Sequence, residues 1–191
     1  ARLEPILLQE IGLAATRKKT LGLRKKVTVP NLASIMFLVE ENNKTLLMTG
    51  DGHWEDILKG LKSIGRLDSN GCMHLDVLKV QHHGSEHNIN EQFCSSITAD
   101  HYILCGDGEH SNPDLDVVEL ILASRTSNLA KTAEAGNNFT MWFNSSSAVT
   151  KANNKAHMQK IEKIVKGKAV KFDNVRFKFM EEGKSFLNLS V

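Results

Sequence analysis

Apolar strand-like segments alternate with amphipathic helical segments between residues 34 and 123, and this alternation constrains the fold more than any other feature of the sequence. Four segments are apolar and end in turn residues, as buried strands do: 34–40, 45–49, 75–80 and 101–105. Three segments have the pattern of helices: 54–64, 88–96 and 112–123. Strands that alternate with helices predict an α/β domain with a layered sheet.

The segments on either side of this alternation predict further elements. On the N-terminal side, residues 3–18 predict a helix, and residues 27–29 predict a short extended piece that Pro30 breaks. On the C-terminal side, the sequence predicts a strand at 139–143 and a basic helix at 152–165. It also predicts a terminal hairpin, whose two strands are 170–179 and 185–191. We expect one domain over 1–191, with its motifs in 31–123 and a tail at 124–191 that completes the sheet.

Composition is typical of a soluble globular protein, with 41% hydrophobic and 24% charged residues. No apolar run is long enough to span a membrane, and the N-terminus has no signal-peptide pattern. The three cysteines, Cys72, Cys94 and Cys105, are widely spaced and predict reduced, buried thiols. These features together indicate a cytoplasmic protein. The missing initiator Met suggests a piece of a longer chain.

Lys and Arg are concentrated in two zones, at 17–26 and 151–171. The net charge of +2 does not by itself indicate a nucleic-acid partner. Basic side chains nevertheless contact phosphates, so a nucleic-acid-binding module is one hypothesis for these zones. A solvated helix end explains the first zone equally well.

Polar residues with metal-binding side chains follow two of the predicted strands directly. Asp51 lies in the string TGDG at 49–52, and His82 and His83 lie in KVQHHGS at 79–85. The carboxyl ends of strands are where open α/β sheets bind ligands, and glycines let the backbone turn sharply there. Carboxylate and imidazole suit zinc, manganese or iron. Asp and Gly are also ordinary turn residues, which is the structural alternative.

These strings, in this order, resemble the C-terminal half of metallo-β-lactamase-fold hydrolases, closest to the branch with the DNA-uptake competence proteins. The string NLAS at 31–34 corresponds to N-x-x-S, LLMTGD at 46–51 to L-L-x-T-G-D, and LKVQHHGS at 78–85 to L-K-V-x-H-H-G-S. A looser match, GDGEHSNP at 106–113, takes the place of a His-Pro helix start. The resemblance implies an αββα sandwich, of which this chain holds the C-terminal half and an α+β tail.

The resemblance also implies roles for single residues around two divalent metal ions, most often zinc, with manganese or iron as alternatives. Asp51 corresponds to the carboxylate that bridges the metals. His83, with His82 as the alternative, corresponds to the last ligand of the second metal. His110 corresponds to a catalytic residue that contacts substrate or donates a proton. Further residues would face the substrate or support the ligands: Lys79, Ser85, Asn31 and Ser34, with Asp107 or Asp76 as acceptors for the bound imidazole.

This sequence departs from the family at the first metal motif, His-x-His-x-Asp-His, which it lacks. Two ligands are not a catalytic metal site. In order of preference, the chain is a fragment, the fold is degenerate and metal-free, or a substitute set such as His53, His87 or Asp107 rebuilds the site. His53 could point into the same crevice as Asp51, although we favour an exposed residue at a helix start.

The function that the resemblance implies is metal-dependent hydrolysis of phosphodiesters, in nucleic acid or nucleotides, by a metal-activated water. The missing N-terminal half of the same protein would supply the other ligands. The alternative is a non-catalytic module that keeps the fold for binding or scaffolding.

Overall fold

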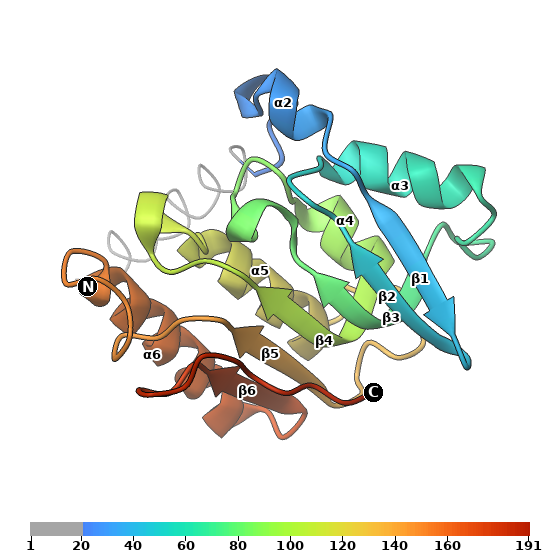
Figure 1. The fold of residues 1–191 in the computed structure, drawn as a ribbon. Helices are drawn as coiled ribbons and strands as arrows, with labels where there is room; N and C mark the ends of the chain where they lie inside the picture. Colours follow the sequence, from blue (N-terminus) through green and yellow to red (C-terminus); the bar gives the residue numbers. More distant parts are fainter. Residues whose placement is uncertain (1–20) are drawn as a thin grey trace, which may run out of the picture.

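A single six-stranded sheet forms the centre of the molecule in the computed structural model, which describes residues 21–191. Its strands lie side by side in chain order: β1 (Phe37–Glu41), β2 (Lys44–Met48), β3 (Met73–Lys79), β4 (Ile97–Leu104), β5 (Phe139–Phe143) and β6 (Val175–Phe179) (Figure 1). β1 and β2 are antiparallel, and each later pair is parallel. The predicted α/β class is confirmed, and the helix expected at 3–18 lies outside the described residues.

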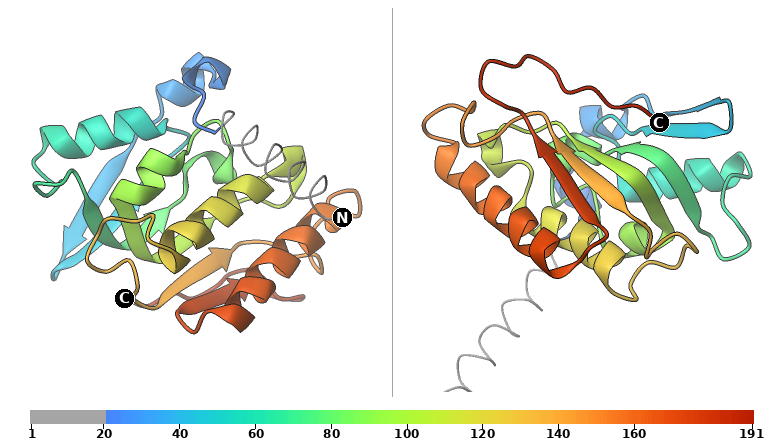
Figure 2. Two further views of the ribbon diagram at one scale, coloured as in Figure 1. Left: turned by 180° about the vertical axis from the view of Figure 1, so that it is seen from behind. Right: turned by 90° about the horizontal axis from the view of Figure 1, so that it is seen from below.

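The helices that pack on the sheet cover one of its faces, as Figure 2 shows for α4, α5 and α6. The α-helices and 3-10 helices (η) are η1 (Arg24–Lys26), α2 (Val29–Leu32), α3 (Trp54–Ser63), η2 (Gln81–Gly84), α4 (Glu91–Ser96), η3 (Glu109–Ser111), α5 (Leu115–Thr126) and α6 (Lys155–Lys171). The last residues of the chain cross the opposite face of the sheet (Figure 2). None of the helices in the described part is long and apolar enough to cross a membrane.

The two faces of the sheet differ because successive residues of a strand point to opposite sides. One row across the sheet contains Leu47, Leu78, Tyr102 and Met141, which are all buried and belong to the core under the helices. We call this side the covered face. The adjacent row on the other side, the open face, contains Phe37, Met48, Lys79, Ile103, Trp142 and Lys178.

Two predicted elements differ from the structure. The piece expected at 27–29 is extended at Val27 and Thr28 but forms no strand, and α2 begins at Val29 with Thr28 as its N-cap. Pro30 is tolerated there because the first residues of a helix have no partner for their N–H groups. The terminal hairpin is also absent, since α6 continues to Lys171 and β6 pairs with β5 in parallel. Residues 185–191 form no strand, and Leu187 and Leu189 line a shallow hollow together with Ile103 and Trp142 on the open face.

The cysteines have no disulfide partner: Cys72 and Cys94 are buried and Cys105 is half-buried. Burial raises the pKa of the Cys94 thiol beyond its ordinary range. The prediction of free thiols is therefore confirmed, with Cys105 more accessible than expected.

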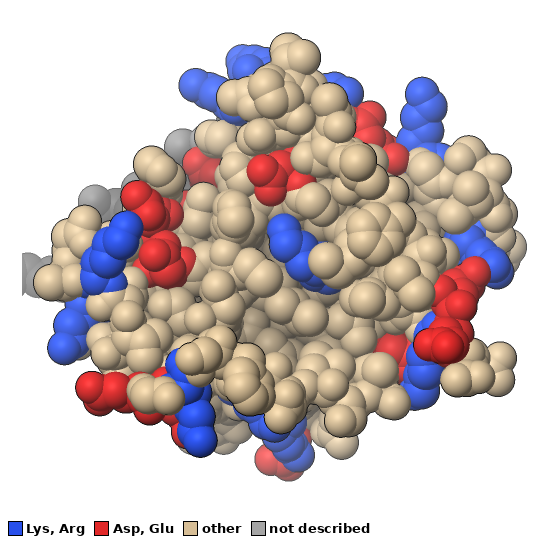
Figure 3. All heavy atoms as spheres, in the orientation of Figure 1, with Lys and Arg blue, Asp and Glu red and all other residues tan. Residues whose placement is uncertain are grey.

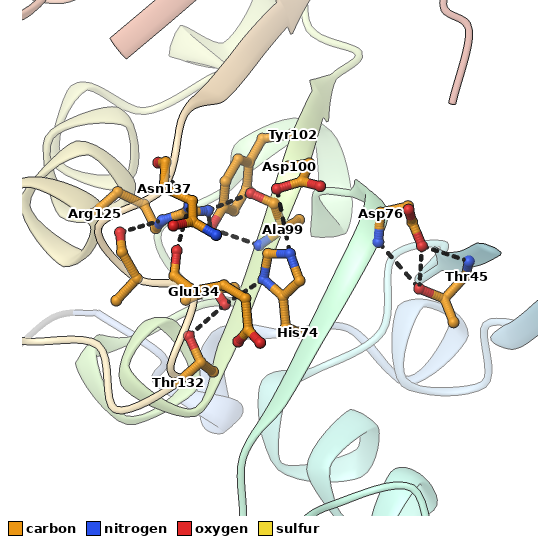
Figure 4. Close-up of polar contacts among 12 residues, drawn as sticks. Thr45, His74, Asp76, Ala99, Asp100, Tyr102, Arg125, Thr132, Glu134 and Asn137 are labelled. Atoms are coloured by element: carbon orange, nitrogen blue, oxygen red, sulfur yellow. Dashed lines mark hydrogen bonds and ion pairs between the residues drawn. The ribbon is translucent and has the colours of Figure 1, made fainter. Parts of the chain in front are cut away.

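Arg125 on α5 is a fully buried arginine that has no carboxylate partner among residues 21–191. Its guanidinium donates to the carbonyl oxygens of Ala99, Glu134, Ala135 and Asn137 and lies 4.8 Å from the ring centroid of Phe139. Figure 4 shows this group between β4 and the loop at 134–137. Arg125 thus ties α5, β4 and that loop together.

Candidate functional site

Three loops that follow β2, β3 and β4 meet at the carboxyl end of the sheet. The loop after β3 is bonded to the loop after β2, because His82 N donates to Gly50 O at 3.0 Å. It is bonded to the end of β4 as well, because His83 Nδ1 lies 2.7 Å from Cys105 O. The two histidines that the sequence singled out therefore lie between the strand end that bears Asp51 and the strand end that bears Cys105.

His82 is held in one tautomer by Asn88. The Asn88 Nδ2 donates to Asp51 O at 2.8 Å and to Gly52 O at 3.2 Å. Since both are carbonyl oxygens, which only accept, the Oδ1 of Asn88 is the atom that faces His82 Nδ1, at 2.9 Å. An amide oxygen accepts, so Nδ1 of His82 carries a proton, and in the neutral ring Nε2 is the acceptor nitrogen.

The His83 ring has the same tautomer for a simpler reason. Its Nδ1 faces the Cys105 carbonyl, so Nδ1 donates, and in the neutral ring Nε2 is again the acceptor nitrogen. The two ring centroids are 5.9 Å apart. A neutral imidazole with a bare Nε2 and an Nδ1–H bonded to the protein is the form in which histidine binds metal.

The backbone conformation that places these rings is unusual. His82 and His83 have φ of 43° and 58°, in the left-handed region, and Gly84 follows at 84°. A non-glycine residue in this region costs on the order of 1–3 kcal/mol, and such residues cluster at functional sites. The strain is a reason to look for a function in this loop.

Asp51 and Lys79 form the charged part of the site. The backbone N of Asp51 donates to Ser34 Oγ at 3.1 Å, which fixes the start of the loop as expected for Ser34. Lys79 Nζ donates to Gly50 O at 3.1 Å. Burial lowers the pKa of Lys79, and the neighbouring Cys105 thiol and Asp51 carboxylate offset part of this effect. The Lys79 amine therefore lies close to the Asp51 carboxylate.

The other predicted site residues lie in different positions. Asn31 Nδ2 is 3.4 Å from His82 Nε2, so Asn31 contacts the ring that it was expected to support. Ser85 is buried in the same loop, and its backbone N donates to His82 O. His110 is exposed on η3, the turn that follows β4.

His53 is neither exposed nor directed into the site, contrary to both expectations. It is fully buried as the N-cap of α3, where Nδ1 accepts from Glu55 N and Nε2 donates to Gly22 O at 3.0 Å. Both ring nitrogens are therefore used within the fold, which leaves His53 no free atom for a metal.

The predicted acceptors for the bound imidazole are also wrong. Asp76 accepts from Thr45 near the start of β2 (Figure 4). It also accepts from Lys44. Asp107 accepts from Glu109 N within its own turn. Asn88 holds the His82 ring, and sequence reasoning missed it because the string NIN at 88–90 was assigned to a helix start. The cap of α4 is in fact Asn90, two residues later.

The donors at this edge of the sheet suit a metal in type but not in number. Imidazole nitrogens with free lone pairs and a carboxylate are ordinary zinc ligands. Within residues 21–191, however, no group of three or more His, Cys, Asp or Glu side chains could hold a metal ion. A catalytic zinc site needs three protein ligands, so the described residues do not complete one.

Charged side chains lie mainly around the rim of the face drawn in Figure 3, where acidic and basic groups alternate, and the middle of that face is largely uncharged. The second basic zone corresponds largely to α6, whose buried residues are Met158, Ile161 and Val165. Most of its lysines are exposed on the remaining surface of that helix, as in an ordinary solvated helix.

No protein-family model, curated protein or solved structure matches this chain.

Gln81 offers a test of how the site affects stability. Its side chain is buried, and neither Oε1 nor Nε2 has a hydrogen-bond partner among the described residues. An unpartnered buried amide costs about 1–3 kcal/mol. Replacing Gln81 by Met, which has a similar volume, is expected to raise the free energy of unfolding by about 1 kcal/mol, measured by urea denaturation.

The control is Gln92→Met on the exposed side of α4, which is expected to change stability by less than about 0.5 kcal/mol. A loss of stability in Gln81→Met would mean that the amide is satisfied in solution, and would contradict the prediction.

Proposed function

We propose that this chain is part of a metal-dependent hydrolase of the metallo-β-lactamase superfamily that cleaves phosphodiesters in nucleic acid or nucleotides. The observation that carries the proposal is the pair of imidazoles at the end of β3, His82 and His83, each with Nδ1 bonded to the protein. In each neutral ring Nε2 is left as the acceptor nitrogen, and that of His82 lies 3.4 Å from Asn31 Nδ2. The adjacent strand end bears the carboxylate of Asp51. These are the positions at which the resemblance places metal ligands.

Two divalent metal ions, most often zinc, would supply a water whose pKa is lowered to about 7 and would neutralise charge on the phosphate. The residues of this chain have simpler roles in the proposal. Asp51 and the Nε2 atoms are the ligands, and the Asp51 carboxylate lies close enough to Lys79 to offset part of the fall in the Lys79 pKa that burial causes. His110, exposed on the turn after β4, is the candidate for contact with the substrate.

The remaining ligands are proposed to come from the N-terminal half of the same protein. The open face supports this, since Phe37 and Val39 are 50% and 42% exposed there. In an αββα sandwich the second sheet would pack against this face and cover these side chains.

The direct test uses the protein together with whatever coding sequence precedes this chain in its gene. We expect bound metal by elemental analysis and hydrolysis of bis(p-nitrophenyl) phosphate. Asp51→Asn, His82→Ala and His83→Ala remove ligands, so the variants with a true ligand removed are expected to lose at least about 100-fold in kcat/KM and part of the metal.

The matched control is Asp173→Asn, an exposed carboxylate in the turn before β6, which is expected to keep both metal and activity. Unchanged metal content in all three site variants would contradict the proposal.

A non-catalytic module is the second candidate, and the observation in its favour is that too few ligand side chains converge within residues 21–191. It predicts a folded full-length protein that binds no metal. The metal analysis of the wild-type protein therefore separates the two candidates.

A further inference from the structure

Asn88 uses every polar group that it has to connect three segments around the site. Its side chain is fully buried. Its backbone N donates to Ser85 O at 3.1 Å, and its backbone O accepts from Trp54 N at the start of α3, also at 3.1 Å. Its Nδ2 donates to the carbonyl oxygens of Asp51 and Gly52, and its Oδ1 faces His82. Asn88 is thus the direct link between the Asp51 loop and the His82 ring.

The orientation of this amide follows from chemistry alone. If the amide were flipped, Oδ1 would face two carbonyl oxygens and Nδ2 would have a single possible acceptor in the His82 ring. The observed orientation satisfies all of these contacts at once, and the buried position leaves no water to replace them. The amide is therefore locked, and the tautomer of His82 with it.

We infer that Asn88 is a positioning residue, which holds the neutral His82 ring in the Nδ1–H tautomer and thereby leaves Nε2 as the acceptor nitrogen, facing Asn31. The role of Nε2 as a metal ligand rests on the proposed function. The tautomer of His82 rests only on its contact with Asn88 and holds whether or not a metal binds. Because a side chain holds His82 but the backbone carbonyl of Cys105 holds His83, only the His82 tautomer can be changed by substitution at one position.

Long-range nitrogen-15 NMR of the imidazole rings tests this inference without metal or substrate. At about pH 8.5, where a histidine of ordinary pKa is neutral, the wild-type protein is expected to show His82 and His83 as Nδ1–H tautomers. Asn88→Leu has a similar shape but no acceptor, so His82 is expected to shift toward the Nε2–H tautomer. His83 is expected to stay unchanged in the same sample, which makes it an internal control.

Asn88→Asp separates positioning from mere packing. A carboxylate keeps the acceptor for His82 Nδ1 but loses the donors to Asp51 and Gly52, so the Nδ1–H tautomer is expected to persist. In the protein with its preceding half, zinc affinity is expected to fall about 10- to 100-fold in Asn88→Leu and by less in Asn88→Asp.

The outcomes distinguish this inference from the proposed function. An Nε2–H tautomer of His82 in the wild-type protein would overturn the role of Asn88, whether or not metal binds, and this measurement does not depend on whether Asn88→Leu folds. The expected tautomers in a protein that binds no zinc would overturn the proposed function and leave Asn88 as the residue that positions His82.

Discussion

Replacing Arg125 with Met is expected to lower the free energy of unfolding by about 3–5 kcal/mol, because it removes the donor of four carbonyl oxygens, one of them in the buried residue Ala99. These carbonyls belong to Ala99, Glu134, Ala135 and Asn137. The contact of the guanidinium with the face of Phe139 is lost as well. Urea denaturation of both proteins would measure the difference.

Two further variants sharpen this test. Arg125→Lys keeps the charge but not the planar fork of donors, so most of the loss is expected to remain. Arg176→Met on β6 removes an exposed arginine that bonds only to nearby carbonyls, and is expected to change stability by less than about 0.5 kcal/mol. A loss below about 1 kcal/mol in Arg125→Met would show that the buried charge is not what holds the loop at 134–137.

Gly84→Ala is expected to destabilise the fold by about 2–4 kcal/mol, since it combines backbone strain with a steric overlap. Gly84 has φ of 84°, and a Cβ there would lie 2.8 Å from the Cβ of Pro113 and 3.2 Å from its Cα. The loop that carries His82 and His83 would have to move away from the loop before α5. Thermal and urea denaturation would measure the loss, and the NMR signals of the two imidazoles would report the movement.

The matched control is Gly60→Ala within α3, where an added Cβ would meet nothing within 4 Å. Alanine is the better helix former, so this variant is expected to gain about 0.5–1 kcal/mol. Equal stability of Gly84→Ala and the wild-type protein would contradict the close approach of the two loops.

The parts of the fold that sequence predicted best are those set by local pattern. Short apolar segments placed β2, which leads to Gly50 and Asp51, and β3, which leads to Gln81 and the two histidines, and so placed Asp51, His82 and His83 at one end of the sheet. The tail at 185–191 alternates apolar and polar residues as a paired strand can, yet in the structure it is an irregular segment without a strand partner. Pattern alone therefore does not distinguish the two arrangements.

The parts that sequence missed depend on partners far away in the chain. Arg125 is in a helix and would ordinarily be read as a surface residue, because only the assembled loop at 134–137 supplies the carbonyls that allow its burial. Asn88 and His53 were misjudged for the same reason. Each looks like a solvated residue at a helix start, and each is buried by contacts with residues more than thirty positions earlier, such as Asp51 for Asn88 and Gly22 for His53.

The left-handed conformations of His82 and His83 have a consequence for any attempt to engineer this protein. Glycine or asparagine would adopt those dihedral angles with less strain, so a search for thermostable variants is expected to favour replacing both imidazoles. Such a search would then gain stability at positions 82 and 83, where the backbone is strained and the imidazoles of the proposed site lie. A library selected for heat resistance alone would erase the feature that distinguishes this loop from an ordinary turn.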